Sequence, residues 1–357
     1  MSVRALRKVV KLSQESEHSR SFVDVLIVTT SHHQEDGRLV RHRNSLLRGG
    51  IKTEIVSFPR KARLAKYVIG IIWAYRTVRA AKPKCVILPD PELHLFLSPF
   101  IKRKLIVISD VHEDYVSVMA DRDWVRGPLK SLVRFSLLAL PRIRDRFSNA
   151  VVVADQSFCR PEDILIENIP HHNDLPEHGI KAPFRAVYVG DIRPSRGIKR
   201  MIDLVDAIPK LTLDLVGPCV SEEEMAALIS EKGLSDRITW HGRQSYKRSW
   251  EIASTCSVGL CLLDRTPAFD KAIPSKVWEY WAVGIPVVVS DLDRLSQLIN
   301  EVGGGIVLGD EKSVSKIQRW ITDENTVLRA GSQGHEYFMG KSIQSSTQLV
   351  KLVSSLT

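Results

Sequence analysis

Residues 271–291 read KAIPSKVWEYWAVGIPVVVSD and predict a loop, a helix, a tight turn and a buried strand, in that order. Pro274 and Ser275 can open the helix, because its first amides lack intrahelical partners and tolerate proline. Gly284 is expected to end the helix in a left-handed conformation, and Pro286 prevents its continuation. The run of three valines that follows is typical of a central parallel strand.

The predicted helix has an apolar face made by Val277, Tyr280 and Trp281, at positions i, i+3 and i+4. Glu279 lies in the middle of this apolar segment. A carboxylate in such a place is costly unless it has a partner. Glu279 is therefore expected either near a ligand or at the rim of the surface.

The chain has 357 residues, which indicates two domains of ordinary size. Its net charge of +10 is uneven: residues 1–180 hold 29 Lys and Arg against 20 Asp and Glu, a net +9, which leaves +1 for the rest. The basic first half is expected to face an anionic partner, such as a phosphate-rich lipid, nucleic acid or an acidic glycan. No nucleic-acid motif is recognised, so nucleic acid is not expected as a partner.

Five cysteines form an odd number without metal-ligand spacing, which predicts reduced thiols and a cytoplasmic location. No segment approaches the roughly 18 apolar residues of a membrane span. Residues 1–21 mix acidic and basic side chains, so we expect an N-terminal arm and not a signal peptide.

Strands and helices alternate through the first half, as in a Rossmann-type unit. The predicted strands are residues 23–30, 51–58, 85–89, 105–110 and 151–154, with helices ending at Arg48, over 60–84 and within 124–147. The helix over 60–84 is basic, with a predicted apolar stripe that includes Ile72, Tyr75 and Val78. It is either a helix packed on the sheet or, with Trp73 and Tyr75 beside its basic residues, a surface for anionic lipid. Both interpretations stay open.

The strand over 105–110 ends in Asp110-Val-His-Glu113. Polar residues at the carboxyl end of a parallel strand lie in the ligand crevice. His112 is thus a candidate to face a ligand, or else it caps the next helix, and Asp110 would orient it or cap that helix. His32 and His33 point in different directions because they are adjacent, and with no third ligand evident we predict no metal site.

The second half opens with a strand over 184–189, the loop GDIRPSRG (190–197) and a helix from Ile198. Loop amides and the guanidinium groups of Arg193 and Arg196 can converge on an anion at such a helix start. This pattern predicts a diphosphate site. Another strand is expected over 212–216, and the triple glutamate after Ser221 indicates an N-cap with an acidic first turn.

The stretch 271–291 resembles the donor-sugar motif of the family 4 retaining GT-B glycosyltransferases. The matching residues are Glu279, Gly284, Pro286, Val287 and Val288. The family's partner glutamate corresponds to Lys271 here, and Pro274-Ser275-Lys276 is similar to the Pro-x-Lys variant of a subset of the family. The loop 190–197 resembles the G-R-x-x-x-x-K-G signature, with Asp191 at the usual Arg position and Arg196 at the Lys position.

The resemblance implies an α/β fold of the GT-B type, with two Rossmann-like domains facing each other across a cleft. We expect an acceptor domain over 22–175, a nucleotide-sugar domain over 176–335 and a C-terminal helix, 336–357, that crosses back to the first domain. The resemblance is specific over 184–308 and loose in the first half.

The implied donor-binding residues belong to the second domain. They are Gly190, Arg193, Arg196, Arg243, Ser275, Lys276 and Glu279. Glu279 would hold the ribose, and His112, Arg196 and Lys276 are the catalytic candidates. The Asp36-Gly-Arg38 loop resembles that of one branch of the family, so Asp36, Arg38 and Glu113 are acceptor-side candidates.

The implied activity is retaining transfer of a sugar from a nucleotide-diphosphate sugar, a UDP-sugar first and a GDP-sugar second. The acceptor is the hydroxyl of a glycan or of a lipid-linked molecule at the inner face of the cell membrane. Neither a metal nor any other cofactor is expected. Two alternatives remain: a nucleotide-sugar 2-epimerase of the same architecture, and a non-catalytic membrane-associated subunit that binds nucleotide sugar.

Overall fold

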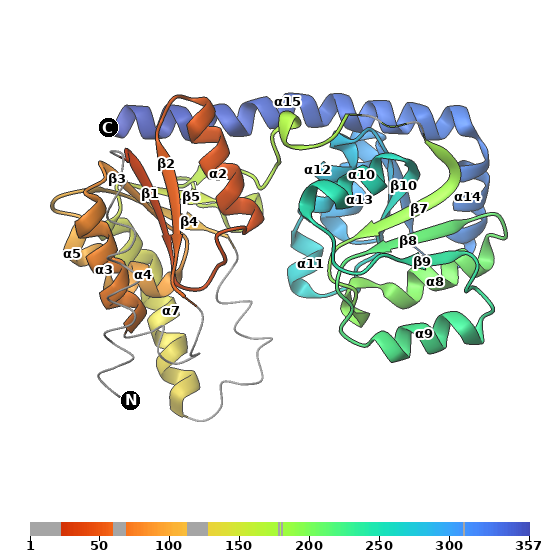
Figure 1. Cartoon of the computed structure of the whole chain (residues 1–357), viewed down its shortest axis with the longest axis horizontal. Helices are drawn as coiled ribbons and strands as arrows, with labels where there is room; N and C mark the ends of the chain where they lie inside the picture. Colours follow the sequence, from red (N-terminus) through yellow and green to blue (C-terminus); the bar gives the residue numbers. More distant parts are fainter. Residues whose placement is uncertain (1–22, 60–68, 113–127, 178, 180, 310) are drawn as a thin grey trace. The chain divides into compact units, whose positions relative to one another are not determined.

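The computed structural model describes residues 23–59, 69–112, 128–177, 179, 181–309 and 311–357. The chain divides into two compact units (Figure 1). Unit 1 takes in the described residues up to Glu167 and the final segment Ser346–Thr357, and unit 2 is Asn168–Ser345. The predicted N-terminal arm, residues 1–21, lies outside the described residues.

Unit 1 contains a six-stranded sheet in the order β2-β1-β3-β4-β5-β6, and neighbouring strands in this order are parallel. Its strands are β1 (Val25–Thr29), β2 (Thr53–Ser57), β3 (Cys85–Leu88), β4 (Ile106–Val111), β5 (Ala150–Val153) and β6 (Ile164–Leu165). Its helices are α2 (Gly37–Arg48), α3 (Ile69–Ala81), α4 (Pro91–Phe96), α5 (Ser98–Ile101) and α7 (Pro128–Phe147). The strands predicted from alternation in this half are confirmed to within two residues at each end.

Unit 2 contains a second parallel six-stranded sheet, in the order β12-β11-β10-β7-β8-β9. Its strands are β7 (Ala182–Val189), β8 (Thr212–Val216), β9 (Ile238–Trp240), β10 (Cys256–Cys261), β11 (Val287–Ser290) and β12 (Gly305–Leu308). Its helices are α8 (Ile198–Ala207), α9 (Glu222–Glu231), α10 (Tyr246–Ser254), α11 (Pro267–Lys271), α12 (Ser275–Ala282), α13 (Asp293–Val302) and α14 (Glu311–Thr322). α15 (Glu324–Leu356) begins in this unit, twelve residues before the start of the predicted C-terminal helix, 336–357.

Each sheet has an apolar core on both faces, as expected of a Rossmann-type unit. In unit 2, α10, α12 and α13 cover one face, and α8, α9 and α14 cover the other (Figure 1). In unit 1, α3, α4 and α5 supply one core, while α2 and the end of α15 supply the other through Leu349 and Val353. These two parallel sheets with interleaved helices confirm the predicted GT-B fold class.

The opening stretch folds as predicted. Pro274 is the N-cap residue of α12, and Gly284 follows the helix with a left-handed φ of 69°. Val287, Val288 and Val289 are fully buried in β11, between β10 and β12. Ser221 occupies the predicted N-cap of α9, but its side chain makes no capping hydrogen bond.

Residues 60–68 of the predicted helix over 60–84 lie outside the described residues, and over the rest the predicted apolar stripe is wrong in part. α3 buries Gly70, Ala74 and Val78, which follow one another at i, i+4 and i+8. Ile72 is instead 50% exposed and Tyr75 is 36% exposed. Trp73 packs against the core and meets Phe58 edge to face at 5.5 Å, so it does not face solvent as an interfacial anchor would.

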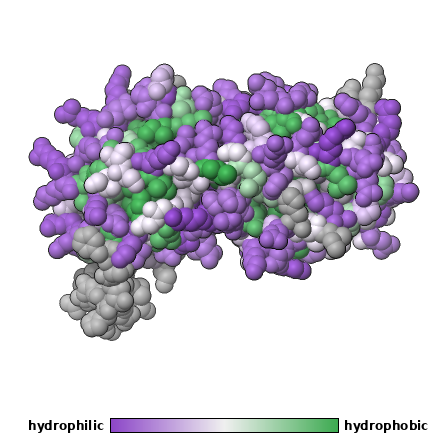
Figure 2. Space-filling model, turned by 90° about the horizontal axis from the view of Figure 1, so that it is seen from above, coloured by the Kyte–Doolittle hydropathy of each residue, from purple (hydrophilic) through white to green (hydrophobic). Residues whose placement is uncertain are grey.

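All five cysteines are unpaired, as predicted. Among the helices of the described residues, none has the length and apolarity needed to cross a membrane. On the face seen in Figure 2, hydrophilic residues predominate and smaller hydrophobic patches lie between them.

Candidate functional site: two clusters at strand ends

The predicted site residues form two clusters, one in each unit. In unit 2, residues predicted to bind the donor lie at the carboxyl end of β7 and at the start of α12. In unit 1, the acceptor-side candidates Asp36 and Arg38 follow β1, and the catalytic candidate His112 follows β4. Carboxyl ends of parallel strands are where open α/β sheets bind ligands.

Gly190 and Lys276 meet directly after β7. A Cβ atom at Gly190 would lie 3.1 Å from Nζ of Lys276, and the φ of Gly190 is +142°, which also favours glycine. The Lys276 ammonium lies 4.0 Å from the centroid of the Tyr188 ring. The aromatic face attracts the cation without compensating its charge.

Arg196 is held in a similar way. It ends the short 3₁₀ turn η5 (Pro194–Arg196), and its guanidinium carbon lies 5.0 Å from the centroid of the Phe269 ring. The charges of Lys276 and Arg196 both act on the thiol of Cys261, whose pKa is raised by burial and lowered in smaller measure by these two cations. Two cations from separate segments therefore gather near one buried strand end.

Arg193 is placed differently. Its Nη2 lies 2.6 Å from Oδ2 of Asp191, and both side chains are about half exposed. Asp191 occupies the position at which the similar family has an arginine. This difference introduces a carboxylate, and it pairs with Arg193. The charge that Arg193 presents to a ligand is correspondingly reduced.

Glu279 is buried, with 6% of its surface exposed, so the surface-rim alternative is excluded. The Tyr246 hydroxyl, at the start of α10, donates a hydrogen bond of 3.0 Å to its Oε1. Ser275 and Lys276 occupy the first turn of α12, where amides lack intrahelical partners and favour anions. Arg243 is exposed in the loop between β9 and α10, directly after Gly242.

Asp110 is the centre of the cluster in unit 1. It is fully buried at the end of β4, and three basic side chains surround it. Arg38 donates to it from Nε at 3.0 Å and from Nη2 at 2.6 Å, and the Nε2 atoms of His42 and His112 lie 3.1 and 2.7 Å from its Oδ2. Burial opposes the charged form, but Arg38 and the two histidines hold the pKa of Asp110 well below its usual range.

Arg38 is engaged within the fold. Its side chain is 3% exposed, and Nη1 donates to the carbonyl of Ile166 at 2.9 Å in addition to the Asp110 contacts. These bonds fill the guanidinium fork with partners from the same unit. Glu113, the other acceptor-side candidate beside His112, lies outside the described residues.

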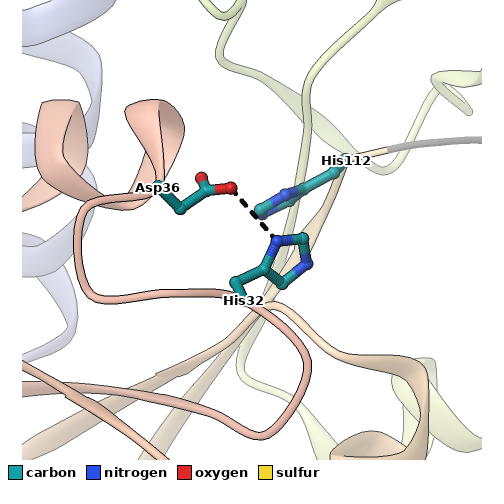
Figure 3. Close-up of side chains that lie close together, drawn as sticks. All are labelled: His32, Asp36 and His112. Atoms are coloured by element: carbon teal, nitrogen blue, oxygen red, sulfur yellow. Dashed lines mark hydrogen bonds and ion pairs between the residues drawn. The ribbon is translucent and has the colours of Figure 1, made fainter. Parts of the chain in front are cut away.

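His112 lies close to two groups from the first-strand loop (Figure 3). Its ring centroid is 5.0 Å from that of His32, and Nδ1 of His32 lies 3.2 Å from Oδ2 of Asp36. Asp36 also caps α2 by accepting from the amides of Arg38 and Leu39. Burial would raise its pKa, but His32 and His112 lower it to about 2, so Asp36 is a carboxylate.

Several contact residues of these clusters carry no signal in the sequence. Tyr188, Phe269 and Tyr246 support Lys276, Arg196 and Glu279, but they come from other segments of unit 2. His42 follows Arg38 by four residues on α2, and this spacing could have placed both on one face of the helix. His32 lies with Asp36 and His112, not with its neighbour His33, and only the fold could show this.

Known proteins resemble this chain in sequence and in fold. Residues 172–337 match the family model described as Glycosyl transferases group 1. A lipopolysaccharide 1,6-galactosyltransferase of Salmonella typhimurium is 31% identical over 120 residues, which cover 32% of this chain and 32% of that protein. The enzyme of the same name from Escherichia coli K12 matches to the same extent. The chain therefore spans about a third of the length of these curated relatives.

Solved structures share the fold at low sequence identity. Sucrose-phosphate synthase from Thermosynechococcus elongatus superposes with a TM-score of 0.69 at 14% identity, over 93% of this chain and 98% of that one. Anabaena HepE in complex with UDP and glucose gives 0.68 at 14% identity, over 93% and 100%. The lipopolysaccharide outer core galactosyltransferase WaaB gives 0.57 at 13% identity, over 91% and 99%. Residues 172–337 thus match the Glycosyl transferases group 1 model, within a chain of the GT-B fold.

Proposed function

We propose that this protein is a retaining glycosyltransferase that moves a hexosyl group from a UDP-sugar to a hydroxyl of a glycan or lipid-linked acceptor. A GDP-sugar is the second choice of donor. The proposal rests on the position of Lys276. Its ammonium group lies beside Gly190, within the segment that matches the family model. The relatives named for galactosyl transfer and the HepE complex with UDP support a UDP-hexose as donor.

In this proposal, Lys276, Arg196 and the first amides of α12 bind the diphosphate. The bond between the anomeric carbon and the phosphate oxygen breaks, and its electron pair stays on the phosphate. The acceptor oxygen bonds to the same face of the anomeric carbon, and its proton passes to the departing phosphate. Cations on aromatic rings stabilise the growing negative charge without reorganising, which is electrostatic catalysis. Neither a metal nor another cofactor takes part.

The remaining candidates take positions around this step. Glu279 holds the ribose hydroxyls, with Tyr246 fixing its Oε1. Arg193 contributes less than Arg196 because Asp191 pairs with it. His112 contacts the transferred sugar, and Arg38 has a positioning role through Asp110. Asp36 and Glu113 remain acceptor-side proposals, and Arg243 lies near the nucleobase.

The first test compares Lys276→Gln with the control Lys316→Gln, an exposed lysine on α14. Calorimetry measures UDP affinity, and release of UDP from UDP-galactose and UDP-glucose measures turnover. Losing a charge-assisted contact of roughly 1.5–3 kcal/mol should weaken UDP binding by about tenfold to a hundredfold. Equal affinities in the two variants would refute the diphosphate assignment. UDP binding without turnover of any donor and acceptor would favour the non-catalytic alternative.

We also propose that unit 1 rests on an anionic membrane surface. The helices α3, α4 and α5 cover one face of its sheet and expose Ile72, Phe96 and Phe100, the last at 72%. Arg103 and Lys104 follow directly and are exposed. Apolar side chains beside basic ones suit the headgroup region of anionic lipid.

Flotation with vesicles tests this surface. Wild type should float with phosphatidylglycerol-containing vesicles and much less with phosphatidylcholine alone. Phe100→Ser should reduce the bound fraction by about tenfold, because a buried Phe contributes roughly 1.5–3 kcal/mol. Leu328→Ser is the control. It also replaces an exposed apolar residue, on α15, and it should not change the bound fraction. Equal flotation of the two variants would remove this surface from the proposal.

A further inference from the structure

Three side chains from separate segments of unit 1 converge in a way that the proposed transfer does not require. His32 follows β1, Asp36 begins α2 and His112 follows β4. One ligand atom from each lies within 4.8 Å of the others, and Figure 3 shows the three side chains directed toward one another. We propose that His32, Asp36 and His112 form a binding site for a divalent transition-metal ion, with Zn²⁺ as the best fit.

The spacing suits a single ion. Two ligand atoms bound tetrahedrally at zinc distances of about 2.0–2.1 Å lie roughly 3.3 Å apart. Nδ1 of His32 and Oδ2 of Asp36 lie 3.2 Å apart, so this pair already has that separation. The third ligand atom needs to approach by at most about 1.5 Å to reach the same separation.

The Nε2 atom of each histidine lies close to a buried carboxyl group. Nε2 of His112 lies 2.7 Å from Oδ2 of Asp110, which leaves Nδ1 as the ligand atom. Nε2 of His32 lies 3.4 Å from Oδ1 of Asp90, and within the described residues this buried oxygen has no hydrogen-bond partner. Binding an ion through Nδ1 of His32 places the proton on Nε2 and directs it at Asp90. Metal-bound histidines characteristically donate their other N–H to a carboxylate.

The donor set indicates the class of ion. Two imidazoles and one carboxylate suit zinc and its neighbours, whereas Ca²⁺ and Mg²⁺ prefer oxygen ligands alone. The side chains of His32, Asp36 and His112 are 31%, 28% and 11% exposed, so an ion can enter from solvent. Three protein ligands leave a fourth position for water.

One consequence rests on the proposed function. His112 is the proposed sugar contact, and an ion bound to its ring would withdraw it from that role. Transfer would then need no metal, yet Zn²⁺ would inhibit it.

The test uses the tag-free, metal-free full chain without any nucleotide sugar. Co²⁺ is titrated as a spectroscopic probe, and its visible absorption bands report the ligand geometry. We expect saturation at one Co²⁺ per chain and displacement by Zn²⁺. UDP affinity, measured separately on the same protein, tells failure of the metal site apart from failure of the proposed donor site.

Variants assign the ligands. Asp36→Asn keeps the size of the side chain and the capping oxygen of α2, and it should weaken Co²⁺ binding at least about tenfold. His32→Gln and His112→Asn should weaken Co²⁺ binding to a similar extent. With three variants, the test still works if one of them does not fold. His33→Ala is the control, because that side chain is 65% exposed and lies outside the cluster. Absent one-to-one binding, or unchanged binding in the three ligand variants, would overturn the proposal.

Discussion

Asp110 in unit 1 lies inside a set of basic side chains, whereas Lys276 and Arg196 in unit 2 lie against aromatic rings. Within the described part of the chain, no salt bridge joins either of these two cations to a carboxylate. In unit 1 the charges of Arg38 and Asp110 compensate each other inside the fold. In unit 2 the rings leave the charges of Lys276 and Arg196 uncompensated, and under the proposed function the diphosphate of the donor compensates them. The contrast is between charges paired inside the fold and charges that we propose to bind a ligand.

A third arrangement lies between these two. Asp214 on β8 accepts from Nε of Arg185 at 2.7 Å, and Nε2 of His241 lies 2.6 Å from its Oδ1. Its partners are 34% and 25% exposed, whereas those of Asp110 are only 3%, 6% and 11% exposed. Burial sets the strength of such networks, because water screens the charges of exposed partners.

Removing Arg38 should have the largest effect. Arg38→Ala leaves the buried carboxylate of Asp110 without its main partner, which should lower the free energy of unfolding by about 3–5 kcal/mol. Urea unfolding measures this, with Arg43→Ala on the same helix as the control. A loss below about 1 kcal/mol would show that His42 and His112 suffice, and the contrast between the two units would weaken.

Removing Arg196 should affect turnover and leave stability nearly unchanged. Arg196→Ala should lower kcat by about a hundredfold to a thousandfold, which is typical of a lost group that stabilises transition-state charge. Arg193→Ala should cost less, because Asp191 already pairs with Arg193. Initial rates with a UDP-hexose measure both. If the two variants lose turnover equally, the ion pair between Asp191 and Arg193 does not persist when the donor is bound.

The smallest effect is expected for Asp214→Asn, at roughly 1.5–3 kcal/mol of stability at neutral pH. Burial would raise the pKa of Asp214, but Arg185 and His241 lower it below its ordinary value of 3.8. A lowered pKa adds stability above the ordinary value, and this stability is lost as pH falls through the folded pKa. Urea unfolding from pH 7 to 3 should show the gap between wild type and variant closing below about pH 4. A gap that stays constant would mean that the carboxylate charge contributes nothing.

The sequence determined the fold class because its signals are local and periodic. Apolar β-branched runs placed the strands of both sheets, and Pro274 with Gly284 placed the ends of α12. The same local signals placed Lys276 and Arg196 at helix starts after strands. The prediction of the buried face of α3 was wrong in part, because the helix has two apolar stripes and either could pack on the sheet. In the structure, the stripe of Gly70, Ala74 and Val78 is buried.

The tertiary structure alone decided which side chains meet. Tyr188 and Phe269 reach Lys276 and Arg196 from other segments, and Asp110 collects Arg38 and His42 from more than sixty positions away. It also brought His32 and Asp36 to His112, although the sequence, with His32 and His33 adjacent and no third ligand evident, had predicted no metal site. Strand order in a parallel sheet is set by long-range pairing, so β1 and β4 place their loops side by side only after the sheet has formed. Local patterns carry no record of that pairing, so the contacts between these side chains could be seen only in the folded structure.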